Sequence, residues 1–327
     1  MRVAVCGLGA VGARAARQLA STPEVEEVIL RDVRADRAKE VAASLGDIAT
    51  VDPPSVTAPP EADVVVLALP PREHAAAAGA LVERGTPVVS TSDAVADVEG
   101  LLDLGPLAEA RGVTVVVGAG FSPGLTCLLA RHAADAFDDV GEIHVARLGT
   151  GGPACAHQHH RALRGTAVDW RDGGWQRRRA GSGRELCWFP DPVGAADCYR
   201  ARLPDALLLV NALGELERVT ARMAATRRDR LTARWPMLRR PHPEGTVGAV
   251  RTEVRGRRDG AWETLVYGAY DRPGIAAGAV AAVAGTALVR GDLGLGPGAS
   301  GLAASDRARD LLAELARRGV KTAAFTG

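Results

Sequence analysis

The stretch Arg2-Val-Ala-Val-Cys-Gly-Leu-Gly-Ala-Val-Gly12 decides the fold of this chain. It begins with a short apolar run, typical of a buried strand, and the pattern G-x-G-x-x-G follows at once and opens a helical segment at residues 12–21. Gly7 permits a tight turn, Gly9 lets the backbone approach a pyrophosphate, and Gly12 allows helix and strand to pack closely. The helix N-terminus offers free N–H groups to phosphates. The stretch therefore predicts a dinucleotide-binding βαβ unit.

A second apolar run at residues 25–30 ends in Arg31-Asp32. Asp32 lies 20 residues after Gly12, where a carboxylate that binds the ribose is expected. Asp32 favours NAD, because it can bond both ribose hydroxyls and repels a 2′-phosphate. The neighbouring Arg31 or Arg34 could turn toward such a phosphate and admit NADP. We expect NAD or NADP as cofactor, with NAD slightly favoured.

Three further apolar runs, at residues 63–69, 87–91 and 113–117, alternate with helical segments. This alternation predicts a parallel sheet covered by helices on both faces. Ligands of such sheets lie beyond the carboxyl ends of the strands, so the segments that follow these runs should border the cofactor. The predicted cofactor contacts are Gly7, Leu8, Gly9, Ala10, Val11, Gly12, Asp32, Val33, Arg34, Leu69, Pro70, Pro71, Thr91 and Ser92.

The pattern changes after Gly120. Residues 143–270 mix strands with loops, and Asp259-Gly260 between two alternating runs is a hairpin signal. Residues 207–223 have a helical pattern, and the chain is helical again from residue 274 onward. We expect residues 1–124 and 272–327 to form the dinucleotide-binding domain and residues 125–271 to form a second, α+β domain.

Composition narrows the function classes. The chain has 327 residues, enough for two domains, with 40 basic against 39 acidic side chains, which gives no broad electrostatic case for nucleic acid or a membrane surface. The five cysteines are scattered without a C-x-x-C pair, so a reducing, cytoplasmic location is expected. Residues 274–289 are uncharged but mostly Ala and Gly, and are predicted to form a buried helix rather than a membrane span of ~20 strongly apolar residues.

Gly120-Phe-Ser122-Pro-Gly124 matches the G-x-S-x-G nucleophile elbow of hydrolases. The elbow needs the backbone N–H of the residue after the serine, and Pro123 has none. The preferred interpretation makes Ser122 the N-cap of a helix and Pro123 its first residue. Such a helix N-terminus suits a carboxylate or carboxamide. We therefore place substrate contacts at Phe121, Ser122, Pro123 and Gly124, and keep a serine hydrolase as an alternative.

His157-Gln-His159-His160-Arg161 is the densest histidine cluster. Its spacing suits metal ligands poorly and no carboxylate completes it, so no metal is expected. One interpretation is substrate recognition, in which Arg161 binds a carboxylate and a histidine moves a proton. The other is a polar surface helix. The candidates for proton transfer are His157, His159, His160, Tyr199 and Asp93.

Over nearly its whole length the chain resembles the saccharopine dehydrogenase family in its shorter bacterial form. The resemblance rests on Gly7–Gly12 with Asp32, on Val115–Leu129, on Tyr267-Gly-Ala-Tyr-Asp271, and on Leu311–Val320. Diaminopimelate dehydrogenase, of similar length and architecture, is the second choice. Residues 67–71 are also similar to sugar oxidoreductases with a histidine–lysine pair, but the two lysines, Lys39 and Lys321, lie outside the relevant region.

The resemblance implies a Rossmann-like, doubly wound parallel sheet with an inserted α+β domain that binds substrate and often pairs subunits into a homodimer. It implies NAD(P)-dependent hydride transfer at a carbon–nitrogen bond of an amine or amino acid. Relatives often carry an acidic residue where this chain has Ser122, a departure at the position that usually recognises the substrate amino group. Two alternatives stay open: oxidative deamination of the diaminopimelate dehydrogenase type, and a dinucleotide-binding regulator without turnover.

Overall fold

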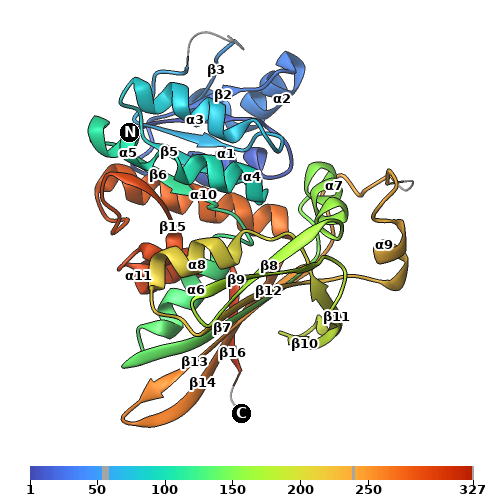
Figure 1. Ribbon diagram of the computed structural model, residues 1–327. Helices are drawn as coiled ribbons and strands as arrows, with labels where there is room; N and C mark the ends of the chain where they lie inside the picture. Colours follow the sequence, from blue (N-terminus) through green and yellow to red (C-terminus); the bar gives the residue numbers. More distant parts are fainter. Residues whose placement is uncertain (54–58, 238–239, 326–327) are drawn as a thin grey trace.

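The computed structural model describes residues 1–53, 59–237 and 240–325. The strands of these residues form two sheets, with the first sheet and its helices above the second in Figure 1. The predicted α/β class with a doubly wound parallel sheet and a second, mixed sheet is confirmed.

The first sheet has the strand order β15-β6-β5-β4-β1-β2-β3, and every pair in it is parallel. Its central strands are runs of buried valine, as expected for a sheet covered on both faces. The strands are β1 (Arg2–Cys6), β2 (Glu27–Arg31), β3 (Ala49–Val51), β4 (Val64–Leu67), β5 (Val88–Ser90), β6 (Thr114–Val117) and β15 (Gly298–Gly301).

Helices from both ends of the chain cover this sheet. The early ones are α1 (Gly12–Ala20), α2 (Ala35–Leu45), η1 (Gly46–Ile48), α3 (His74–Glu83), α4 (Val95–Leu102) and α5 (Gly105–Arg111). The late ones are α10 (Pro273–Arg290), η2 (Leu302–Ala304) and α11 (Ala308–Arg317).

The helix α10 lies against α1, and glycine makes that approach possible. A Cβ on Gly278 would lie 2.7 Å from the backbone nitrogen of Ala15. By length and hydropathy α10 is the one described helix that could cross a membrane, yet 78% of that window is buried inside the protein. It is therefore the core helix that its Ala and Gly content predicts.

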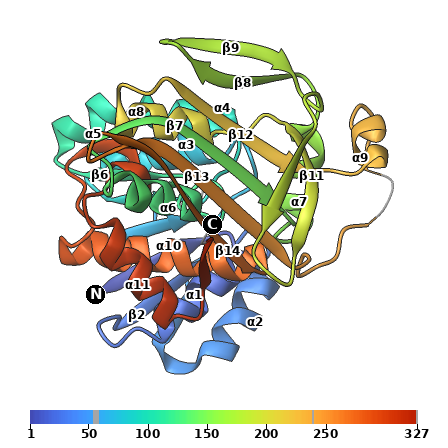
Figure 2. The ribbon, with the colours of Figure 1, turned by 90° about the horizontal axis from the view of Figure 1, so that it is seen from below.

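The second sheet runs β10-β11-β12-β7-β13-β14-β16, with β8 and β9 attached to β12. Figure 2 shows the long strands β7 and β13 side by side, with the β8–β9 hairpin and α9 at the periphery. The strands are β7 (Asp139–Leu148), β8 (Thr166–Arg171), β9 (Gly174–Arg179), β10 (Glu185–Phe189), β11 (Gly194–Arg200), β12 (Arg218–Ala224), β13 (Gly248–Arg258), β14 (Ala261–Asp271) and β16 (Lys321–Phe325). The helices are α6 (Leu125–Ala134), α7 (Pro153–Ala162), α8 (Asp205–Leu213) and α9 (Arg227–Thr232).

Two expectations about these segments are wrong. Residues 207–223 are not one helix, because α8 ends at Leu213 and Gly214, with φ of +72°, turns the chain into β12. The strand β16 does not join the first sheet with the rest of residues 272–327. It pairs with β14 and continues the second sheet beyond the β13–β14 hairpin.

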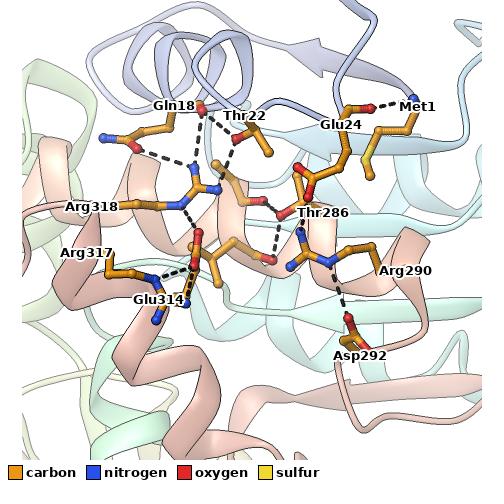
Figure 3. A network of polar contacts seen from close by, with 12 residues as sticks. Met1, Gln18, Thr22, Glu24, Thr286, Arg290, Asp292, Glu314, Arg317 and Arg318 are labelled. Atoms are coloured by element: carbon orange, nitrogen blue, oxygen red, sulfur yellow. Dashed lines mark hydrogen bonds and ion pairs between the residues drawn. The ribbon is translucent and has the colours of Figure 1, made fainter.

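A polar network ties the C-terminal helix to the first one (Figure 3). Arg318, at the end of α11, donates hydrogen bonds to the Gln18 carbonyl at 3.2 Å and to the Thr22 hydroxyl at 3.0 Å. Glu314 accepts from Arg318 at 2.8 Å and so holds the guanidinium in place. The late segment is therefore anchored on the first domain before it crosses to β16.

Candidate functional site

A cavity of about 570 Å³ lies beyond the carboxyl ends of β1, β4 and β5, where α7 and the loop after β7 face the first sheet. This is the edge at which open α/β sheets bind their ligands. The predicted site residues that line it are Leu8, Gly9, Ala10, Val11, Leu69, Pro71, Thr91, Ser92, Asp93, Phe121, Ser122 and His159.

The three glycines of the first loop have three separate roles. Gly7 has φ of +89°, and a Cβ there would lie 2.4 Å from the Ala68 carbonyl oxygen. A Cβ on Gly12 would lie 1.8 Å from the Gly7 oxygen. A Cβ on Gly9 would meet nothing within 4 Å, so this glycine keeps open the space above the loop. The helix α1 that follows has no side-chain cap and no acid in its first turn, which leaves its amides for an anion.

Asp32 lies directly behind this loop. Its carboxylate accepts hydrogen bonds from the backbone N–H of Leu8 at 2.7 Å and of Arg34 at 2.9 Å. It therefore shapes the cavity wall through Leu8. Of the two arginines that the sequence suggested for a 2′-phosphate, Arg31 is paired with Asp52 and Arg34 does not line the cavity. Two other cations, Arg17 of α1 and Arg37 of α2, do line it.

Eight predicted residues belong to the adjoining segments but do not line the cavity. They are Gly7, Gly12, Asp32, Val33, Arg34, Pro70, Pro123 and Gly124. Val33 points outward and is largely exposed.

Four predicted residues lie away from the cavity. His157 and Arg161 are exposed on the outer side of α7. His160 is buried and its Nε2 donates to the carbonyls of Thr232 and Trp235, both at 3.1 Å, so it anchors the segment after α9. Tyr199 lies beneath the guanidinium of Arg230 in a different cavity. The three histidines of α7 differ in this way because the helix turns only one side toward the cavity, and of the three only His159 lies on that side.

The interpretation of Ser122 as an N-cap is wrong. The helix α6 begins at Leu125, its N-cap is Gly124 with φ of +121°, and no side chain caps it. The Ser122 hydroxyl instead donates at 2.9 Å to Oδ1 of Asp205, the first residue of α8, and Thr126 donates to the same oxygen at 2.6 Å. Asp205 is completely buried, and burial raises the pKa of its carboxyl group. The carboxyl group beside Ser122 thus comes from α8, a distant segment of the chain.

Arg147, at the end of β7, is the cationic centre of the cavity wall. It is 7% exposed, and its Nη1 donates to Asp93 at 2.9 Å and to the Ser122 carbonyl at 2.8 Å. Its Nε is buried, with no hydrogen-bond partner in the described part of the chain. Arg147 thus joins the second sheet to two segments of the first domain.

His159 is the one predicted histidine that lines the cavity. Its Nε2 lies 3.2 Å from the Ala224 carbonyl, which can only accept, so Nε2 carries the proton and Nδ1 has a free lone pair. Burial, assisted by the positive charge of Arg147, lowers the pKa of His159 to about 4. The imidazole is therefore neutral near pH 7.

Buried polar atoms without partners concentrate at this site. Within the described ranges there are five such side-chain atoms, and three of them are Arg147 Nε, His159 Nδ1 and Asp205 Oδ2. Such atoms are costly, and proteins retain them where a ligand or a reaction uses them. This clustering singles out the part of the cavity near Ser122 as its reactive end.

Sequence reasoning missed Arg147, Asp205 and His74. His74 lines the cavity, donates to the Leu69 carbonyl and accepts from the Ser90 hydroxyl, both at 2.9 Å. No local motif distinguishes these residues, because each meets the site only through tertiary contacts. Two sequence features could have pointed to them. Arg147 is a charged residue at the end of an apolar strand, and Asp205 is an acidic residue at the start of a helix.

The loop after β7, Gly149-Thr-Gly-Gly152, closes the cavity against the dinucleotide loop. A Cβ on Gly152 would lie 2.7 Å from that of Ala10, and one on Gly151 would lie 2.9 Å from the Gly274 nitrogen. Larger residues would push the second sheet away from the first. Glycine here keeps α7, and with it His159, close to the first domain.

Comparisons with known proteins agree with this architecture. Residues 1–119 match the model of an oxidoreductase family with an NAD-binding Rossmann fold. Apo saccharopine dehydrogenase (L-Glu forming) from Saccharomyces cerevisiae superposes with a TM-score of 0.74 at 17% identity, covering 99% of this chain and 100% of that one. A myo-inositol dehydrogenase homologue from Sinorhizobium meliloti 1021 gives a TM-score of 0.51 at 12% identity, with both chains fully covered. The diaminopimelate dehydrogenase of C. glutamicum gives 0.49 at 17% identity, with 98% of this chain and 99% of that one covered.

The first domain is thus an NAD-binding Rossmann fold of the oxidoreductase type. The expected likeness to saccharopine dehydrogenase is confirmed as a shared fold over the whole chain. Both lysines are exposed and neither lines the cavity, so the histidine–lysine pair of the sugar oxidoreductases has no counterpart. Within the described ranges no group of three His, Cys, Asp or Glu side chains could hold a metal ion.

Proposed function

We propose that the protein is an NAD(P)-dependent oxidoreductase that transfers a hydride at a carbon–nitrogen bond of an amine or amino-acid substrate. The observation that carries this proposal is one continuous cavity that begins at the dinucleotide loop and is lined at its other end by Ser122, Arg147 and His159. Arg147 and His159 each have a buried atom without a partner, and so does Asp205, which lies behind Ser122. A nicotinamide bound here would accept or donate the hydride. The chain's own residues must then bind the substrate and handle its proton.

The dinucleotide fits the first half of this cavity. The open space above Gly9, the uncapped start of α1 and the wall of Leu8, Ala10 and Val11 suit a pyrophosphate. The carboxylate of Asp32 at the end of β2 supports NAD over NADP. Arg17 and Arg37 are the cations that a 2′-phosphate would meet instead.

The second half suits an amino-acid substrate. We assign the substrate carboxylate to Arg147 in place of Arg161, because Arg147 lines the cavity whereas Arg161 is exposed outside it. Neutral His159 can take a proton from the substrate nitrogen on Nδ1 as the hydride leaves the adjacent carbon. Asp93 holds Arg147 in position. Cys155 also lines the cavity, but burial raises the pKa of its thiol to about 11, so it stays protonated.

Titration with NADH and NADPH, followed by nicotinamide fluorescence, is the first test. Saturable binding, followed by turnover in a screen of amines paired with keto acids, would support the proposal. Binding without turnover on any pair would favour the regulator, and no binding of either nucleotide would overturn the oxidoreductase.

The homodimer expected from the sequence remains a prediction. Trp188 and Leu186 are 62% and 58% exposed on one face of β10, the edge strand of the second sheet, and could form its contact. Light scattering after size exclusion, with Trp188→Ser as the variant, would test it.

A further inference from the structure

A second cavity, of about 750 Å³, lies in the second domain, lined by residues of β9, β11 and α9 and of the turn after α7. The side chains that line it are unusual in charge. Six arginines and one acidic residue, Asp197, line it, in a chain whose basic and acidic residues otherwise nearly balance. The six are Arg164, Arg179, Arg184, Arg227, Arg230 and Arg234.

The arginines come from four separate segments, so the fold gathers them. Arg184 is paired with Asp197 at 2.9 Å, which uses the one carboxylate in the lining. Arg230 is held by two contacts: its Nε donates to the Gly181 carbonyl at 2.9 Å, and its guanidinium lies 4.0 Å above the ring of Tyr199. A guanidinium fixed by stacking is prearranged for anion binding.

Like charges that converge in one hollow repel each other unless an anion lies among them. A single phosphate would fill little of this volume, and a macromolecule would need a basic face rather than a hollow. Planar guanidinium groups match phosphate oxygens in pairs. The cavity therefore suits a small molecule with several phosphate groups.

Two elements connect this cavity to the reactive end of the first. The early residues of α7 and His159 line the first cavity, and Leu163–Gly165, just after α7, line the second. On β12, the Ala224 carbonyl accepts from His159, and the next residues, Ala225–Arg227, line the second cavity. Figure 1 shows α7 at the boundary between the two sheets, with α9 on its outer side.

We propose that the arginine-lined cavity binds a small molecule carrying several phosphate groups, and that its occupancy shifts the position of His159. The binding claim stands independently, whereas a regulatory effect on turnover rests on the proposed function. A ligand that draws Arg227 and Arg164 inward would move both chain segments that hold the imidazole.

Isothermal titration with inorganic tripolyphosphate, at low salt and with the dinucleotide site saturated by NADH, measures the binding. We expect one site, with affinity that falls as salt rises. Arg179→Glu and Arg227→Glu should each weaken it at least ~10-fold. The matched control is Arg177→Glu, an exposed arginine on the same strand as Arg179 but outside the cavity, which should bind like the parent.

The same titration has outcomes that overturn the proposal. One is no saturable binding up to ~10 mM tripolyphosphate. Another is binding that Gly9→Asp abolishes while Arg179→Glu does not, which would place the anion at the dinucleotide loop. A third is equal weakening by Arg177→Glu, which would mean diffuse attraction. If citrate binds as tightly as tripolyphosphate, the site recognises charge alone and the phosphate assignment is wrong.

The link to His159 has a readout that needs no turnover. Imidazole NMR resonances, with that of His159 identified by its absence in His159→Asn, should shift when tripolyphosphate is added. The resonance of exposed His157 serves as the internal reference. If the anion binds tightly and the His159 resonance does not shift, the proposed coupling to His159 is wrong, and the proposed binding site stands. Absence of dehydrogenase activity would affect neither measurement.

Discussion

The two ends of the main cavity are built in opposite ways. At the dinucleotide end, one continuous stretch from Arg2 to Gly12 supplies strand, turn and helix, and each glycine has a local reason to be glycine. At the reactive end, Arg147, His159 and Asp205 come from β7, α7 and α8. The first end is specified by local backbone geometry, and the second by the packing of one sheet against another. A single added side-chain atom at a glycine should therefore disrupt the dinucleotide end. The reactive end should instead be disrupted by substitutions that remove one member of a contact between distant segments.

The largest effect is expected from Gly9→Asp. A carboxylate would enter the open space where the pyrophosphate binds, and an uncompensated charge there should weaken NADH binding ~1,000-fold, or ~4 kcal/mol. Thermal stability should stay near that of the parent, because nothing lies within 4 Å of the new Cβ. The matched variant Gly12→Ala should instead lower stability, since its Cβ would collide with the Gly7 oxygen. Equal stability losses in both would contradict the distinct roles of these glycines.

Arg147→Met tests the reactive end. The substitution leaves Asp93 unpaired and removes the assigned carboxylate contact. We therefore expect kcat/KM to fall about 150-fold, which corresponds to a loss of ~3 kcal/mol of transition-state stabilisation. NADH affinity should change little. A variant that loses dinucleotide binding and turnover together would show that the two ends are not separable.

His159→Asn should lower kcat by about 100-fold, because a positioned proton acceptor contributes roughly this much. His157→Asn is the control on the same helix, since His157 is exposed and outside the cavity. Unchanged kcat in His159→Asn, measured at saturating substrate and cofactor, would remove this residue from the mechanism.

The pH dependence of stability follows from the same histidine. Its pKa is lowered from 6.5 to about 4 in the folded protein, so the unfolded chain binds more protons between these values. The folded state should lose up to ~3 kcal/mol as the pH falls from 6.5 toward 4. Thermal melts across this range should show a shallower loss in His159→Asn. Parallel melting curves would mean that His159 is accessible to protons in the fold.

The smallest effect concerns cofactor choice. Asp32→Ser removes the charge beside the expected ribose and should raise NADPH affinity relative to NADH ~10-fold. Asp36→Ser, which removes an exposed carboxylate in the first turn of α2, should leave the ratio unchanged. If the ratio of NADPH to NADH affinity does not change in Asp32→Ser, Asp32 does not determine cofactor choice, and Arg17 and Arg37 are the next residues to test.

This contrast also explains what the sequence could predict. The βαβ unit, the parallel sheet and the start of the cavity follow from patterns within about 35 residues, since glycine geometry and apolar periodicity are local. The Asp205–Ser122 contact spans 83 residues and the contact between Arg147 and Asp93 spans 54. A single sequence contains no pattern for such pairs. Ser122 was misinterpreted for this reason: its partner is a distant carboxylate rather than the adjacent helix.

The position of β15 has a consequence for the order in which the protein is made. The strand β6 pairs with β15, and the Thr114 hydroxyl donates to the Gly296 carbonyl, 182 residues further along. A ribosome adding ~5–20 residues per second needs about 10–40 s to supply that partner. During this time β6 has an open edge, a template for pairing with other chains. The whole second domain must emerge before the first sheet can be completed, so the nascent chain exposes the edge of β6 from the time it is about a third synthesised until β15 follows.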